Sequence, residues 1–166
     1  MLIKLCFDNP YRNKKSGSPS RQRNIGQNSN VNPVELMRFH PVLNKLAIGT
    51  VKLLLEDAKL VKMNPNTLLF GHNEPNTNWY FILFGTLVLH HEDLGALGVL
   101  SIEHTVGEES IIKGEQKKLD ACYSQKETYL LELKQEKWQE LKEILYATGQ
   151  RAEFLKLDRL LQHNCT

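Results

Sequence analysis

Short apolar runs divided by turn residues fill the middle of the chain, and they constrain the fold more than any other feature. Between Leu60 and Leu133 turn-forming residues recur, among them Asn66, Gly85 and Gly95. Short strands at this spacing are typical of an antiparallel sandwich or jelly roll. The runs are Val61, Leu68–Phe70, Tyr80–Leu83, Leu87–Leu89, Leu97–Ile102, Cys122–Tyr123 and Thr128–Leu133. We therefore predict about eight strands.

Helical spacing of apolar residues replaces this pattern on both sides of the strands. Asn32 followed by Pro33 is a typical helix start, because asparagine caps free N–H groups and proline suits the first turn. The expected helices are Pro33 to Phe39, Ala47 to Ala58, Lys134 to Tyr146 and Ala152 to Leu161. The predicted fold class is mainly β: a cupin-like jelly roll with helix before it and two helices after it.

The N-terminal segment has a different composition from the rest of the chain. Residues 9–34 contain no acidic residue and are rich in asparagine, serine and glutamine. Such a segment buries too little apolar surface to fold alone. Its basic residues are Arg12, Lys14, Lys15, Arg21 and Arg23. We expect a basic arm over 1–31 that contacts a partner rather than its own barrel, a folded domain over 32–161 and a tail over 162–166.

Composition and motif searches exclude several classes of protein. The 166 residues carry a net charge of +2, which does not indicate a general polyanion-binding surface. Cys6, Cys122 and Cys165 lack zinc-site spacing, and no apolar run approaches the roughly 18 residues of a spanning helix. No nucleophile elbow, phosphate loop or dinucleotide fingerprint occurs. We expect a cytoplasmic protein that is not an enzyme and has no membrane span.

Two further features bear on metal and DNA binding. His90-His91-Glu92 suggests a cupin-type metal site, but consecutive strand residues point to opposite faces of a sheet. A metal enzyme is therefore only a remote alternative, and no metal ligands are assigned. Five residues follow Leu161, so we expect no helix-turn-helix and no DNA binding.

Two motifs resemble those of the cyclic nucleotide-binding domain family. The first is Thr67–Phe70 followed by Trp79–Leu89, with Gly85 inside the second stretch. The second is Val106-Gly107-Glu108 followed by Ser110-Ile111-Ile112, which is similar to the family's phosphate-binding cassette. The resemblance covers about residues 36–161. It implies a jelly roll that holds cAMP or cGMP, with the terminal helices acting as lid and relay.

The resemblance also implies which residues would contact the nucleotide. Glu108, after Gly107, would accept a hydrogen bond from the ribose 2′-hydroxyl. The backbone N–H groups of Glu109 and Ser110, at the start of a short helix, would face the phosphate. Phe154 or Leu157, from the last helix, would cap the base.

The sequence departs from the family pattern where the phosphate would bind. The cassette arginine is replaced by lysine, and both Lys117 and Lys118 fit its position. Lysine keeps the charge but loses the forked geometry of arginine. Because a charged hydrogen bond contributes about 1.5–3 kcal/mol, poorer geometry would weaken binding roughly ten- to a hundredfold. Asn66 replaces a family glycine, which asparagine's tolerance of positive φ permits.

These departures favour a non-catalytic regulatory or structural subunit of a larger assembly. Such a scaffold-type module would keep the barrel, while its nucleotide binding would be weak or lost. The alternative is a working cAMP or cGMP sensor that controls a partner in trans. Protein partners would dock on the basic arm and the terminal helices. By analogy alone, the assembly would be a cytoskeletal or flagellar complex.

Overall fold

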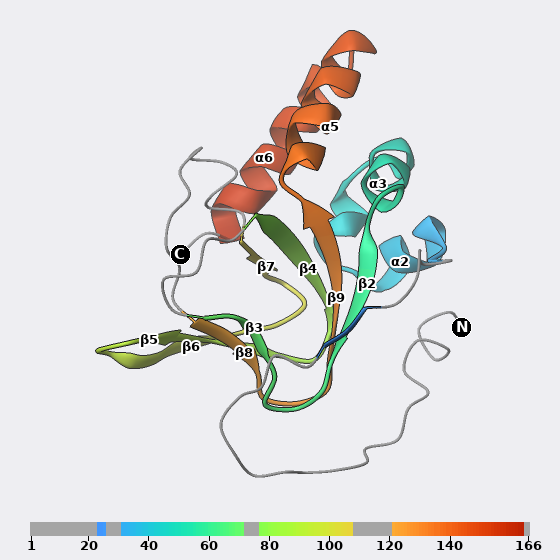
Figure 1. Cartoon of the computed structure of the whole chain (residues 1–166). Helices are drawn as coiled ribbons and strands as arrows, with labels where there is room; N and C mark the ends of the chain where they lie inside the picture. Colours follow the sequence, from blue (N-terminus) through green and yellow to red (C-terminus); the bar gives the residue numbers. More distant parts are fainter. Residues whose placement is uncertain (1–22, 26–30, 72–76, 108–120, 165–166) are drawn as a thin grey trace.

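The computed structural model describes residues 23–25, 31–71, 77–107 and 121–164, which form two antiparallel sheets with helices beside one of them (Figure 1). One sheet has the strand order β1-β2-β9-β4-β7 and the other β3-β8-β5-β6. The strands are β1 (Arg23–Ile25), β2 (Lys59–Met63), β3 (Leu68–Phe70), β4 (Asn78–Phe84), β5 (Leu87–His91), β6 (Gly95–Leu100), β7 (Thr105–Val106), β8 (Ala121–Ser124) and β9 (Thr128–Lys134). The predicted jelly roll is confirmed, with β1 as an additional strand.

The helices lie close to their expected positions. They are α2 (Pro33–Phe39), the 3-10 helix η1 (Leu43–Lys45), α3 (Ile48–Leu55), α5 (Glu136–Ala147) and α6 (Arg151–Asn164). The predicted cap of α2 is present, since Asn32 Oδ1 accepts a hydrogen bond of 2.9 Å from the N–H of Val34. Helix α3 is shorter than expected, because the chain has entered β2 by Lys59. No described helix is long and apolar enough to cross a membrane.

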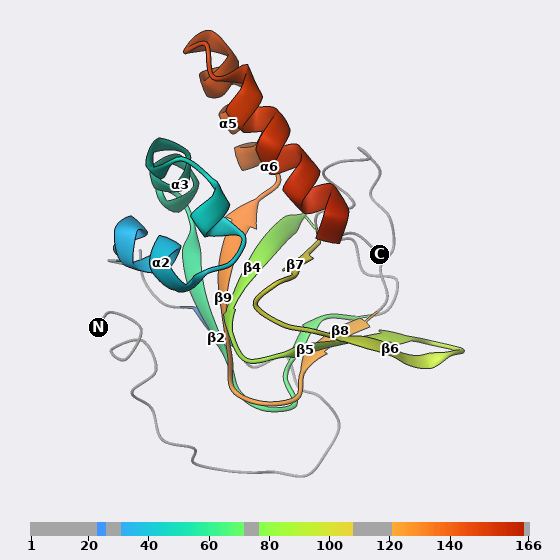
Figure 2. The ribbon, with the colours of Figure 1, turned by 180° about the vertical axis from the view of Figure 1, so that it is seen from behind.

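The five-stranded sheet is buried on both faces, which explains its continuous apolar runs. Along β4, Trp79, Phe81 and Leu83 face the helices, whereas Tyr80 and Ile82 face the other sheet. Figure 2 shows α2, α3, α5 and α6 gathered on one side of β2, β9 and β4. The molecule therefore has two cores, one under the helices and one inside the barrel.

The structure corrects the expectation that the arm leaves its own barrel. Residues Arg23 and Ile25 of β1 lie opposite Met63 and Val61 of β2, in antiparallel register. Without β1, β2 would be an edge strand with unpaired backbone groups, which short covering strands commonly prevent. The arm therefore contacts its own barrel at residues 23–25. Residues 1–22 and 26–30 lie outside the described part of the chain.

Candidate functional site

The inside of the barrel is the place where the resemblance puts a ligand. Its described walls are mostly apolar, with the buried Glu132 opposite Tyr80 on the same face of the sheet. Ten side chains form this barrel-interior cluster, each no more than 8% exposed. They are Val61, Met63, Leu69, Phe70, Tyr80, Ile82, Leu87, Val106, Cys122 and Leu130. Burial raises the pKa of the Cys122 thiol far above its usual range, so this thiol stays protonated. The cluster offers contact surface to a ring system, and the one buried lysine of the described residues, Lys137, lies on the helix side of the sheet rather than beside it.

The described residues just before and just after the expected cassette both belong to this cluster. Val106 of β7 lies opposite Tyr80, and Cys122 of β8 lies opposite Leu89. After β7, Gly107 has a φ of 82°, a conformation that favours glycine. This φ is compatible with the predicted turn, and the predicted ligand contact of Gly107 stays a prediction. The other five predicted cassette residues, Glu108, Glu109, Ser110, Lys117 and Lys118, lie outside the described residues, and their roles stay predictions.

The two residues predicted to cap the base belong to the helix-side core. The ring of Phe154 lies 4.8 Å from that of Trp138 and 5.7 Å from that of Tyr146. Leu157 is fully buried in the core that contains Trp79 and Leu141. The structure does not place either side chain in the barrel-interior cluster. Their role as ligand contacts therefore stays a prediction.

His40 joins the N-terminal helices to the barrel, a role that the sequence did not indicate. Its Nε2 lies 3.0 Å from the carbonyl oxygen of Ile82 in β4. Its Nδ1 accepts hydrogen bonds from the N–H groups of Val42 and Leu43, at 3.3 and 3.2 Å. Burial lowers the pKa of His40 to about 4, although the hydrogen bond to Ile82 opposes this effect. The ring is therefore neutral at pH 7 and donates from Nε2.

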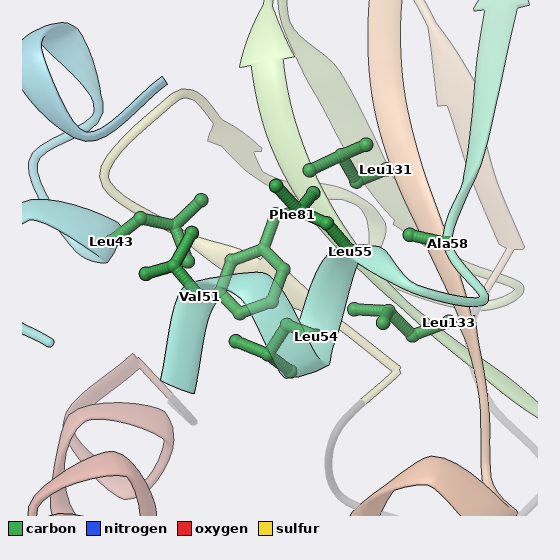
Figure 3. A pocket seen from close by; sticks show the side chains of 8 residues that line it. All are labelled: Leu43, Val51, Leu54, Leu55, Ala58, Phe81, Leu131 and Leu133. Carbon is green, nitrogen blue, oxygen red and sulfur yellow. The ribbon is translucent and has the colours of Figure 1, made fainter. Parts of the chain in front are cut away.

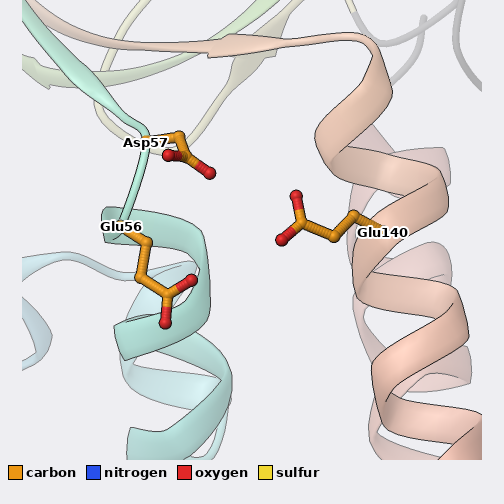
Figure 4. Close-up of side chains that lie close together, drawn as sticks. All are labelled: Glu56, Asp57 and Glu140. Atoms are coloured by element: carbon orange, nitrogen blue, oxygen red, sulfur yellow. The ribbon is translucent and has the colours of Figure 1, made fainter.

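Glu56 and Asp57, where α3 passes into β2, face Glu140 of α5, so that three carboxylates gather between the two elements (Figure 4). The oxygens of Glu56, Asp57 and Glu140 lie within 4.8 Å of one another, which suggests a cation site. The cation is Lys137, whose Nζ lies 3.6, 3.1 and 3.5 Å from them and whose side chain is 2% exposed. We therefore assign this cluster to a structural ion-pair network.

The proposed histidine metal motif has a structural role at the β5–β6 turn. His91 Nδ1 accepts hydrogen bonds from the N–H groups of Asp93 and Leu94, at 3.1 and 3.2 Å. These bonds fix the turn after β5 and give the Nδ1 atom of His91 a structural role.

A narrow gap lies between α3 and the sheet, on the helix side (Figure 3). It has no room for a water molecule, and the side chains that line it are all apolar. Val51 and Leu54 of α3 face Phe81 of β4 and Leu131 of β9 across it. The gap is a packing seam of the helix-side core and lies on the opposite face of the sheet from the barrel interior.

Comparisons with known proteins identify the fold. No family model and no curated protein matches the sequence. A putative cyclic nucleotide-binding protein from Geobacter metallireducens has a TM-score of 0.64 at 14% identity, covering 82% of this chain and 99% of that one. The sensor domain of the transcriptional regulator DNR from Pseudomonas aeruginosa has a TM-score of 0.61 at 15% identity, covering 79% and 91%.

A third similar structure is the regulatory subunit of a cAMP-independent protein kinase A from Trypanosoma brucei. Its TM-score is 0.59 at 14% identity, and the match covers 73% of this chain and 46% of that one. The chain has the fold of cyclic nucleotide-binding-like domains, and the resemblance expected from its two motifs is confirmed at the level of the fold.

Proposed function

We propose that this protein is a non-catalytic regulatory or structural subunit of a larger assembly, and that its barrel binds cyclic nucleotides weakly or not at all. The observation that carries the proposal is the apolar barrel-interior cluster. Among the described residues Lys137 is the one buried lysine or arginine, and it lies on the helix side of the sheet, so recognition of a cyclic phosphate would rest on residues 108–120. There the sequence offers Lys117 or Lys118 in place of a forked arginine.

The energetic reason is the cost of removing a phosphate from water. A buried charge is tolerated only when paired and hydrogen-bonded. A lysine makes a point contact, whereas arginine makes two parallel hydrogen bonds. The similar T. brucei protein, a regulatory subunit of a cAMP-independent kinase, supports a regulatory role for this fold without cAMP dependence. Within the cell, partners would contact the basic arm and the exposed faces of α5 and α6, with the folded domain beginning near residue 32.

Calorimetric titration of the full chain with cAMP and with cGMP tests the proposal. We expect no saturable heat at micromolar nucleotide and no rise in melting temperature. Lys117→Arg and Lys118→Arg, made separately, should reveal whether either position regains binding through the arginine fork. Saturable micromolar binding by the unmodified chain, abolished by Glu108→Ala, would contradict the proposal.

The second candidate function is a working cAMP or cGMP sensor that controls a partner in trans. Gly107 favours it, because its φ of 82° is a conformation that suits glycine at the residue where the expected cassette begins. A sensor would show the Glu108-dependent binding just described. It would also change its affinity for the partner when nucleotide is added, since a ligand shifts an equilibrium only by binding one state more tightly.

A further inference from the structure

The β5–β6 hairpin projects from the barrel and ends in an exposed apolar strand (Figures 1 and 2). Four consecutive residues of β6, from Ala96 to Val99, are exposed. Leu97 and Val99 are 49% and 54% exposed, and Leu94 at the turn is 74% exposed. Scattered apolar residues on a surface need no explanation, but three on one projecting hairpin form a local patch.

The backbone of β6 is also open to pairing. Within the described residues, β6 is the last strand of its sheet and pairs only with β5. Edge strands are usually protected by lysine, proline, inward-pointing charges or β-bulges. Between Leu94 and Ile102 the sequence has no charged residue and no proline. The pairing with β5 has a bulge at Leu97, between the pairs Ala96–His90 and Gly98–Leu89, and it is regular from Gly98 to Leu100.

We propose that two copies of this chain associate edge to edge through β6, as antiparallel strands close to a twofold axis at Gly98. A twofold contact must be complementary to itself. An uncharged strand meets this condition, because no like charges face each other across the axis. With Gly98 on the axis, Leu97 of each copy lies opposite Val99 of the other, so that the most exposed side chains of β6 cover one another.

The size of the contact sets the expected strength. Five residues of backbone pairing from each copy, with a bulge at Leu97 and two apolar contacts, bury less than the roughly 1,200–2,000 Å² of a stable interface. We therefore expect a weak dimer, with a dissociation constant on the order of 10–100 µM.

Analytical ultracentrifugation of the full chain from about 1 to about 300 µM tests the association. We expect a reversible monomer–dimer equilibrium. Leu97→Lys and Val99→Lys should each raise the dissociation constant at least tenfold, since each places like charges on both sides of the axis. Leu155→Lys is the matched control, because Leu155 is 37% exposed on α6, away from the hairpin. A chain that stays monomeric throughout, or a dimer unaffected by Leu97→Lys and Val99→Lys, would overturn the proposal.

Disulfide trapping tests the geometry separately. A side chain added at Gly98 meets nothing within 4 Å, so a cysteine fits there. Residues directly opposite on antiparallel strands lie about 4.5–5.5 Å apart, within disulfide reach. Gly98→Cys, with Cys6 and Cys165 replaced by serine, should form a crosslinked dimer under mild oxidation. Gly49→Cys is the control, since it is equally open but lies in α3. Equal crosslinking of the two variants would contradict pairing through β6.

Discussion

A buried imidazole with all its hydrogen bonds made is the strongest single-residue link between the helices and the barrel. His40 is 0% exposed and bonds Ile82, Val42 and Leu43 only when neutral with its proton on Nε2. The folded protein resists its protonation until about pH 4, whereas an unfolded histidine takes a proton below about pH 6.5. Protonation therefore favours the unfolded chain in this window.

We expect His40 to make stability fall as the pH drops from about 6.5 to about 4. The contribution is complete above pH 6.5, and about 3 kcal/mol of it is lost across the window, since each pKa unit corresponds to about 1.4 kcal/mol. Urea unfolding at several pH values measures this. His40→Gln should be less stable at pH 7 and should show a shallower decline. Identical slopes for the two proteins would show that His40 does not titrate as described.

The β4–β5 turn requires glycine at position 85. Its φ is 89°, and an added Cβ would collide with the backbone oxygen of Glu127 and lie 2.5 Å from Oγ1 of Thr128. That hydroxyl also donates to the carbonyl of Thr86, at 3.1 Å, so it is not free to move aside.

Gly85→Ala should destabilise the fold by at least about 2 kcal/mol, through left-handed strain and the collision with backbone. Chemical denaturation provides the measurement. Gly49→Ala is the control: its Cβ meets nothing within 4 Å, so the change should be within about 1 kcal/mol. Similar effects at both positions would mean that the turn relaxes around the added methyl group.

At the scale of elements, one lysine fastens α5 to the connection between α3 and β2. The Lys137 side chain is buried, while Glu56, Asp57 and Glu140 keep part of their surface in water. A buried charge that loses its partners is costly, and three carboxylates that lose their cation repel one another.

Lys137→Met should lower the free energy of unfolding by about 1–3 kcal/mol, because methionine keeps the packing but leaves the carboxylates unbalanced. Adding Asp57→Asn should recover part of this loss, whereas Asp57→Asn alone should be mildly destabilising. Denaturation of the four proteins forms a double-mutant cycle that isolates the pair. A coupling energy near zero would show that Lys137 acts only through packing.

The strands and helices could be predicted where the local pattern is decisive. Asn32 and Pro33 located the start of α2, and Asn66 takes the φ of 60° that its position requires. Strand β7 has only two residues, Thr105 and Val106, too few to show any alternation. Strand β1 lies in a polar segment and exists because β2 needs a neighbour, which is a tertiary effect that no local pattern contains.

The candidate site could be predicted only in part. Gly107 is visible in the sequence because glycine beside an apolar strand and a glutamate marks a turn. The residues of the apolar interior could not be identified beforehand, since β4 is apolar on both faces and its alternation is hidden. His40 gave no signal, because its partners Ile82 and Val42 contribute only backbone atoms. The sequence did not show that the ring of Phe154 packs against Trp138 and Tyr146, because these contacts depend on how α5 and α6 pack together.

At the scale of the whole molecule, the five-stranded sheet is the shared wall of two cores. Its helix side carries Trp79, Phe81 and Leu131, and its barrel side carries Tyr80, Ile82 and Leu130. A structural change in one core can therefore affect the other core through a single strand. Helix α6 extends this link to the N-terminal helices, because the Glu153 carboxylate accepts a hydrogen bond of 2.5 Å from the N–H of Ala47, at the start of α3.

The N-terminal arm contributes to the fold at residues 23–25, so truncations on either side of β1 should differ. Removing residues 1–22 leaves β1 able to pair with β2, whereas removing residues 1–25 exposes the edge from Val61 to Met63. A short edge strand contributes a few backbone hydrogen bonds, each about 0.5–1.5 kcal/mol net. We expect the longer truncation to be less stable than the shorter one by about 1–2 kcal/mol, measured by urea unfolding.

The same two proteins separate folding from binding. If the basic residues Arg12, Lys14, Lys15 and Arg21 serve a partner, removing 1–22 should weaken assembly while leaving stability close to that of the full chain. The weakening should mimic that caused by added salt, since exposed charges are screened within about 8 Å at physiological ionic strength. Removing 1–25 should then affect stability and assembly together. Equal stabilities of the two truncated proteins would show that β1 adds nothing to the sheet, and unchanged assembly after removal of 1–22 would leave the basic arm without the role proposed for it.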